Sequence, residues 1–491
     1  MNDLKGKTVS GFIFKFLERA GAQGIKFLVS LLLARILLPE QYGTVALVIS
    51  FIAFCDVFVT YGFGNSLIAD KNSDDIDFST CFYFGIALSL VVYALVFFGA
   101  PIIARFFEKF DESVLVPVIR VMGLRIPIAA INSVQHAYVS KHMMFKKFFY
   151  ATLIGTIISG AIAVVMAYMN FGVWALVEQY LGNVFIDTVC LAVIVKWRPI
   201  KAFSFQRLKK IYNYGWKILL VGLLDTGYKE LRSFIIGKKY SKSDLGYYNK
   251  GNDFPATGMS LVEPTVNGVL FPALSQCRDN QDEMRNITRR VIKSSTYIIF
   301  PIMIGLASVA TPLITVLLTE KWLPSVIFLQ IGCLAYMFRP LQFINNSVIK
   351  ASGRSGLLLK LDFLKKGIGI VLLLISMNFG VEGIAISLAV TYCISAIINI
   401  APNRKILNYG YMAQIKDVLA NLSISLVMGG IVYAISFIKL NSILLLCIQI
   451  VVGVVVYILL SIITKNDSFF YFRNMVMRLL GNKLSKKQNH D

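Results

Sequence analysis

The chain has 491 residues, of which 56% are hydrophobic and only 15% charged, and it contains 36 Phe and 22 Tyr. A soluble protein of this length exposes far more charge, so the composition excludes that class and indicates an integral membrane protein. The formal net charge of +22 is scattered between apolar segments and forms no basic soluble domain, which argues against nucleic-acid binding.

About fourteen apolar segments are long enough to cross a bilayer as helices, and short polar connections separate them. The first is too long and too charged for a cleavable signal peptide, so we keep it as a membrane helix. The sequence therefore predicts an all-α polytopic membrane protein. The predicted spans are 10–35, 41–63, 78–104, 115–137, 148–169, 173–195, 211–237, 252–274, 291–313, 325–349, 357–378, 381–400, 415–437 and 441–464.

The two halves of the chain repeat one another. The sequence Met-Asn-Phe-Gly-Val occurs at 169–173 and at 377–381, and a pattern of Arg followed seven positions later by Asn-Ser-Val begins at Arg125 and at Arg339. Each copy holds six spans, an even number, so the copies share one membrane orientation. We expect two six-helix lobes related by a pseudo-twofold axis along the membrane normal, followed by two further helices.

Connections between the spans suggest domain limits and orientation. Most of the Lys and Arg residues outside the spans fall in alternate connections, so the positive-inside rule places both termini in the cytoplasm. After the last span, 469–480 mixes apolar and basic residues as an interfacial helix does. The predicted domains are a lobe at 1–195, a basic cytoplasmic linker at 196–210, a lobe at 211–400, two helices at 401–464 and an interfacial helix with tail at 465–491.

Basic residues inside several spans are the strongest functional signal. A cation at membrane depth costs about 2.5–3.5 kcal/mol, so it normally faces a bundle interior or a wet cavity. Helical spacing puts several of these cations on common stripes with polar neighbours, which predicts a cationic path for an anion. Snorkelling to the lipid headgroups is the alternative. The candidate substrate-binding residues are Lys15, Arg19, Lys26, Arg125, Asn132, Lys229, Arg232, Arg339 and Asn346, with His136 as a polar lining residue.

Acidic residues inside the spans are fewer. Asp225 and Glu230 are the candidates for ion coupling, although structural pairing with Lys229 or Arg232 explains them equally well. Glu263 precedes a proline in a span with three prolines, which predicts a kinked or broken eighth helix. The seven Cys show no paired spacing and indicate neither disulfides nor a metal site, and the sequence calls for no cofactor.

Several separated motifs carry a resemblance to a known family. The stretch LARILLPEQYG at 33–43, LGYYN at 245–249, VLFPALS at 269–275 and EKWLP at 320–324 resemble signatures of Wzx-type polysaccharide exporters. These exporters belong to the multidrug/oligosaccharidyl-lipid/polysaccharide (MOP) superfamily, and the branch with the colanic-acid and teichuronic-acid exporters is the most similar. The family has no compact binding motif, so the candidate site depends on the stripes above.

The resemblance implies a non-enzymatic flippase of a bacterial cytoplasmic membrane. Such a protein moves oligosaccharide units linked to undecaprenyl pyrophosphate by alternating access between its lobes. Pyrophosphate is anionic, and Arg binds phosphate bidentately, so a cavity with Arg and Lys suits this substrate. Membrane lipids are expected partners, whereas contact with polysaccharide polymerisation machinery has no residue-level support.

Three alternatives remain. A lipid II flippase also has fourteen spans and a cationic cavity, and only the motifs separate it from the exporters. A multidrug extruder of the same superfamily carries mainly organic cations, for which a cationic lining is unfavourable. A polysaccharide polymerase or ligase is an enzyme with a sizeable external catalytic loop, and every predicted external connection here is short.

The predicted topology is testable by thiol labelling. In a background without the native cysteines, single cysteines at Ser204 and Ser243 should react with an impermeant thiol reagent from opposite sides of the membrane, because one predicted span separates them. Labelling of both positions from one side would contradict the topology.

Overall fold

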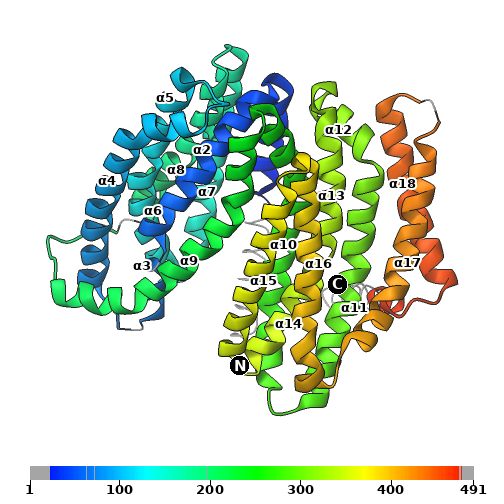
Figure 1. Cartoon of the computed structure of the whole chain (residues 1–491). Coiled ribbons are helices and arrows are strands. Elements are labelled where there is room, and N and C mark those ends of the chain that lie inside the picture. Colours follow the sequence, from blue (N-terminus) through cyan, green and yellow to red (C-terminus); the bar gives the residue numbers. More distant parts are fainter. Residues whose placement is uncertain are drawn as a thin grey trace, which may run out of the picture. The chain divides into compact units, whose positions relative to one another are not determined.

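The computed structural model describes residues 21–474 and 477, except positions 22, 62, 71, 196 and 439 (Figure 1). In this part of the chain the regular structure is helical and includes no strand, which confirms the predicted all-α class. The chain divides into two compact units, Met1–Asn249 and Lys250–Asp491, and each is described by itself. The finer domain limits expected from the sequence remain predictions.

Unit 1 consists of helices that follow one another with short connections. The first described helical stretch covers 23–36. α4 shows how such a helix starts: Asp74 accepts hydrogen bonds from the backbone N–H groups of Ile76 and Asp77, both at 3.1 Å. The remaining helices are α2 (Pro39–Thr60), α3 (Phe63–Ala69), α4 (Asp75–Phe106), α5 (Glu112–Gly123), α6 (Arg125–Lys141), α7 (Phe145–Tyr168), α8 (Val173–Val195) and α9 (Phe205–Lys239), with the start of α10 (Lys242–Gln276).

Unit 2 contains the rest of α10 and the helices after it. α10 is one continuous helix although it includes Pro255, Pro264 and Pro272, so the predicted eighth helix is not broken there, and a kink at these prolines stays a prediction. The other helices are α11 (Gln281–Ser308), α12 (Ala310–Leu318), the 3₁₀ helix η1 (Glu320–Ser325), α13 (Val326–Met337), α14 (Arg339–Ala351), α15 (Ser355–Ser376), α16 (Gly380–Leu407), α17 (Tyr411–Ile435) and α18 (Ser442–Ile463).

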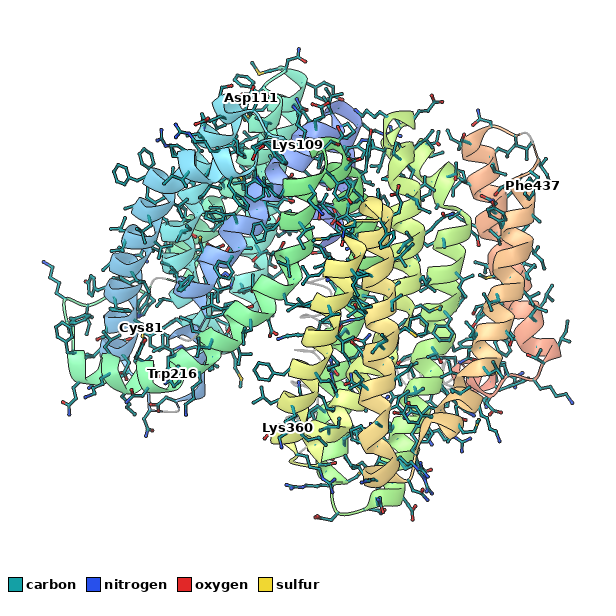
Figure 2. The ribbon with its side chains drawn as sticks, viewed as in Figure 1. Cys81, Lys109, Asp111, Trp216, Lys360 and Phe437 are labelled. Atoms are coloured by element: carbon teal, nitrogen blue, oxygen red, sulfur yellow. The ribbon has the colours of Figure 1, made fainter. Side chains whose placement is uncertain are left out.

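The helices agree with the predicted spans. From 41–63 onward, each predicted span coincides with one helix or with two consecutive helices. Ten helical segments of the described residues are long and apolar enough to cross a membrane. Figure 2 shows Lys109 and Asp111 at one end of unit 1 and Cys81 and Trp216 toward the other, as expected for a membrane-crossing α4. Residues 467–474 are helical and overlap the segment 469–480, whose place at the membrane interface stays a prediction.

Two predicted spans are interrupted at equivalent places. Span 115–137 is divided between α5 and α6 at Leu124, and span 325–349 is divided between α13 and α14 at Phe338. Both residues keep right-handed helical dihedral angles, so each interruption is one residue long and the two helices on either side form one long helical segment. Pro127 and Pro340 follow the two interruptions, and a proline cannot donate the hydrogen bond that would carry a helix through. Each second helix begins with one of the two repeated arginines. The repeat therefore places an arginine at a helix interruption within a span.

The basic linker packs against an acidic connection. Arg207 Nη1 donates to Asp74 Oδ1 at 2.5 Å, and Lys210 Nζ donates to Asp70 Oδ2 at 2.8 Å. The hydrogen bond from Arg207 is the main reason that the pKa of Asp74 lies below its ordinary value. Both pairs are exposed to solvent, so they position the linker and contribute little to stability.

Two glycines bring α2 and α10 into backbone contact. A Cβ atom at Gly43 would lie 1.7 Å from the Lys242 carbonyl oxygen, and one at Gly246 would lie 2.2 Å from the Pro39 carbonyl oxygen. Gly246 follows Gly43 by 203 positions, close to the repeat offset. Each glycine thus meets the residue four positions before the other, and the contact is symmetric between the two copies of the repeat.

Because the two backbones are in contact, a single added methyl group at either glycine should lower the stability of the protein. Gly43→Ala and Gly246→Ala should each lower the free energy of unfolding by about 1–3 kcal/mol, because the two helices must separate. Gly99→Ala is the matched control, since a Cβ at Gly99 meets no atom within 4 Å. Thermal unfolding of the purified protein in detergent measures the difference. Equal midpoints for all three variants would rule out the close contact.

Candidate functional site

A polar cavity of about 640 Å³ lies inside unit 1, among α2, α3, α6, α8 and α9. Five residues singled out by the sequence line it, which are Arg125, Asn132, Asp225, Lys229 and Glu230. His136 lines it as well, as predicted, and so does Asp56 of α2. The stripes of separate spans therefore meet at one cavity.

Arg125 is paired with a buried carboxylate. Its Nε donates to Asp56 Oδ2 at 3.0 Å, and the side chains are 31% and 12% exposed. The second oxygen of Asp56 is buried without a hydrogen-bond partner among the described residues. A carboxylate in this setting is stabilised by its cation, and it leaves part of the guanidinium facing the cavity.

A second carboxylate organises the other polar residues of α6. Asn132 Nδ2 donates to Asp187 Oδ2 at 2.8 Å, and Thr152 Oγ1 donates to Asp187 Oδ1 at 3.1 Å. His136 Nε2 lies 3.1 Å from the same Oδ2, a distance that suits donation from a protonated Nε2. Asp187 is 7% exposed, so these contacts satisfy a buried charge and hold the α6 side chains in place.

Only part of the stripe predicted on α9 lines the cavity: Asp225 and Lys229 do, and Arg232 does not. Lys229 Nζ lies 3.5 Å from Glu230, which also accepts a hydrogen bond from Ser50 at 2.7 Å. Arg232 is 4% exposed, lies 5.6 Å from the Tyr228 ring and does not line the cavity. Its Nε and Nη2 have no hydrogen-bond acceptor in the described part of the chain.

Of the three candidates on the first span, the structure describes Lys26. Lys26 lines a small cavity of about 80 Å³ together with Arg125 and Asn183. Lys15 and Arg19 lie outside the described residues. Within the described wall of the larger cavity, two permanent cations face three carboxylates, so the lining is mixed in charge.

Unit 2 contains the equivalent ion pair. Arg339 Nη2 donates to Glu263 of α10, and the guanidinium lies 5.5 Å from the Tyr392 ring. Glu263 follows Asp56 by 207 positions and Arg339 follows Arg125 by 214, both within the range of the repeat offsets. Each unit therefore pairs an arginine at a helix interruption with a carboxylate on the second helix of its repeat.

Asn346 does not match Asn132 in its contacts. Asn346 is half-buried, and its Oδ1 has no hydrogen-bond partner among the residues described. Its neighbour Asn345 is fully buried and bonds instead to Asn403 and to Gln414, which donates to it at 2.9 Å. The buried amide network thus ties α14 to α16 and α17.

Spacing along single helices missed the acidic partners. Asp56, Asp187 and Glu263 are acids within predicted spans, but each lies on a different helix from the Arg125, Asn132 or Arg339 side chain that it contacts. One signal was available, because the offset that aligns Arg125 with Arg339 also brings Asp56 close to Glu263. Comparing the two copies for polar residues in any span would have found both pairs.

The buried pair predicts a measurable coupling. Arg125→Gln should lower the free energy of unfolding by about 3–5 kcal/mol, because it leaves the Asp56 charge uncompensated. The double variant with Asp56→Asn should recover part of that loss. Unfolding in mixed detergent and SDS micelles measures all four proteins of the cycle.

The exposed pair of Arg105 and Glu112, 3.6 Å apart, is the matched control. Its coupling should be below about 1 kcal/mol. Additive effects of Asp56→Asn and Arg125→Gln would argue that the two residues do not interact.

Comparison with known proteins identifies the family. A model described as "Polysaccharide biosynthesis protein" matches residues 32–327. The succinoglycan biosynthesis transport protein ExoT of Rhizobium meliloti is 24% identical over 320 residues, which cover 65% of this chain and slightly less than two thirds, 64%, of ExoT. The teichuronic acid biosynthesis protein TuaB of Bacillus subtilis is 24% identical over 421 residues, covering 83% of this chain and 86% of TuaB.

The fold has a solved counterpart. The lipid II flippase MurJ in its inward closed conformation aligns with a TM-score of 0.74 at 14% identity, covering 95% of this chain and 100% of MurJ. At that identity the likeness concerns the fold alone. The family model matches more than half of the residues, so the chain belongs to the polysaccharide biosynthesis protein family.

Proposed function

We propose that this transporter moves oligosaccharide units linked to undecaprenyl pyrophosphate across a bacterial cytoplasmic membrane by alternating access. Family membership and the names of ExoT and TuaB support a polysaccharide precursor as the cargo. The observation that carries the proposal is the repeated ion pair, Arg125 with Asp56 and Arg339 with Glu263. A guanidinium within a membrane span is suited to a pyrophosphate that must pass through the membrane.

Binding in this proposal is an exchange of partners. In the ground state each arginine is neutralised by its carboxylate, which keeps the cost of a charge inside the membrane low. An incoming pyrophosphate offers two charged oxygens and replaces the carboxylate as the partner of Arg125. The freed Asp56 is then a buried charge alone, which is costly unless it takes up a proton or a cation. Cargo binding and ion uptake are thereby linked.

Other polar residues of the cavity have supporting roles in the same proposal. Lys229 is the most exposed cation of the described wall and is the first to meet an anion that enters. Asp225 and Glu230 remain the proposed ion-coupling groups, together with Asp56. Asn132 and His136, held by Asp187, offer hydrogen bonds to sugar hydroxyls.

Lipid II flipping is the second candidate, favoured by the full-length likeness to MurJ. The two functions differ in the precursor that accumulates when the transporter is lost. A deletion strain should accumulate polysaccharide repeat units on the cytoplasmic leaflet and keep a normal level of external lipid II. Arrest of peptidoglycan synthesis on deletion would favour the second candidate.

Substitutions that change the charge or the shape of Arg125 and Arg339 test whether these side chains bind the cargo. In a deletion strain complemented with variants, Arg125→Lys and Arg339→Lys should each give a partial loss of surface polymer, because Lys keeps the charge but loses the bidentate geometry. Arg125→Glu should be worse, since it repels pyrophosphate in a low-dielectric cavity. Surface polymer and internal lipid-linked repeat units are the two readouts.

Arg105→Lys is the matched control, because Arg105 is exposed at the end of α4 and does not line the cavity. Membrane levels of every variant are measured by quantitative blotting, which separates a transport defect from loss of protein. Wild-type export from the double variant Arg125→Ala/Arg339→Ala at a normal membrane level would refute the role of both residues.

A further inference from the structure

A second polar cavity lies in unit 2, far along the chain from the proposed transport site. It has a volume of about 440 Å³ and lies between the first half of α11 and the helix at 467–474. Its wall includes Arg289, Arg290 and Lys293 of α11, and Asp467, Ser468 and Tyr471 of the C-terminal helix. We call it the α11 cavity.

Two of its cations are fixed by a buried carboxylate. Arg289 donates from Nε and Nη2 to the two oxygens of Asp417 at 2.6 and 2.7 Å, and Lys293 lies 3.4 Å from Asp417. The Tyr409 hydroxyl donates to the same carboxylate at 2.9 Å, and the Asp417 side chain is 5% exposed. This network holds α11 against α17 and sets the positions of Arg289 and Lys293.

Arg290 is placed differently from its neighbours. Its guanidinium lies 5.7 Å from the Tyr471 ring, and no carboxylate forms an ion pair with it in the described part of the chain. Tyr471 is 43% exposed, so the aromatic ring and the cation form one edge of the cavity. A cation against an exposed tyrosine is an arrangement typical of the membrane–water interface.

The cavity carries surplus positive charge. An adjoining cavity of about 280 Å³ shares Lys293, Asp467 and Ser468 with it and adds two further cations, Lys416 and Lys465. Across the two cavities, five Lys and Arg residues stand against Asp417 and Asp467, a surplus of three positive charges among the described residues. Such a hollow is electrostatically suited to an anion.

The surface beside the cavity changes from cationic to apolar along α11. Arg290 and Ser294 are followed at intervals of four residues by Ile298 and Ile302, which are 43% and 53% exposed. Residues four apart lie above one another on a helix, so the four lie on one face of α11, where Arg290, Ile298 and Ile302 are exposed and Ser294 is half-buried. α11 is long and apolar enough to cross a membrane, so the exposed side chains of Ile298 and Ile302 are suited to contact with lipid acyl chains.

We propose that the α11 cavity binds the phosphodiester headgroup of an anionic phospholipid, with its acyl chains along Ile298 and Ile302. A basic hollow between membrane helices is a recognised type of lipid headgroup site. A soluble anion would use the cations alone, whereas a lipid uses the cations and the exposed isoleucines together. This inference does not depend on the cargo of the transporter.

Native mass spectrometry of the full chain in detergent tests the proposal, with phosphatidylglycerol as the probe and zwitterionic phosphatidylethanolamine as the reference lipid. The wild-type protein should bind phosphatidylglycerol more tightly. Arg290→Gln should weaken phosphatidylglycerol binding about fivefold, as expected for one cation near a lipid surface, and should leave the reference lipid unaffected. Arg290→Lys should bind nearly as the wild type does.

Arg285→Gln is the matched control, because Arg285 lies on the same helix, pairs with Asp282 at 2.9 Å and does not line the cavity. Equal loss in Arg285→Gln and Arg290→Gln, or equal affinity of the wild type for both lipids, would overturn the proposal. So would displacement of bound phosphatidylglycerol by millimolar inorganic phosphate, which would identify a site for soluble anions. If Arg290→Gln does not fold, Lys465→Gln tests the surplus of positive charge instead, because Lys465 lines the adjoining cavity that contributes to this surplus. The affinity of Lys465→Gln for phosphatidylglycerol should fall in the same way.

Discussion

A charged side chain inside the hydrocarbon layer is tolerated only where an opposite charge or a wet surface lies within its reach. This constraint accounts for the ion pairs that join helices in both units. Arg125 and Arg339 are each neutralised by a carboxylate from another helix, and Asp417 is held by two cations of α11. The pairs join helices that are distant in the chain, so the contacts that make the charges tolerable also connect the helices.

The two copies of the repeat preserve an arrangement of side chain and backbone together. An interruption at Leu124 or Phe338, a proline shortly after it and an arginine directly after it occur in both units. The repeat therefore preserves the position of the arginine relative to the helix boundary before it. In the proposed mechanism, an arginine that is neutralised by its carboxylate at rest binds an anion by exchanging partners.

The sequence was sufficient to predict the helices and to identify Arg125 and Arg339 as matched residues. Hydropathy and the internal repeat can both be read along a single chain without knowledge of the fold. The sequence was insufficient for the partners of these arginines, since helical spacing compares residues of a single helix and Asp56 lies on a different one. Arg232 shows a second limit. Three residues turn an α-helix by about 300°, so Arg232 points about 60° away from Lys229 and is buried, although both were assigned to one stripe.

The contact between Gly43 and Gly246 has a consequence for synthesis of the protein. The two glycines are 203 positions apart, so the ribosome completes most of the first half of the chain before the second helix of the contact exists. Until then α2 stands in the membrane with its glycine face open to lipid or to an insertion factor. The contact between α2 and α10 can thus form only after α10 has been synthesised, and it joins residues far apart in the sequence.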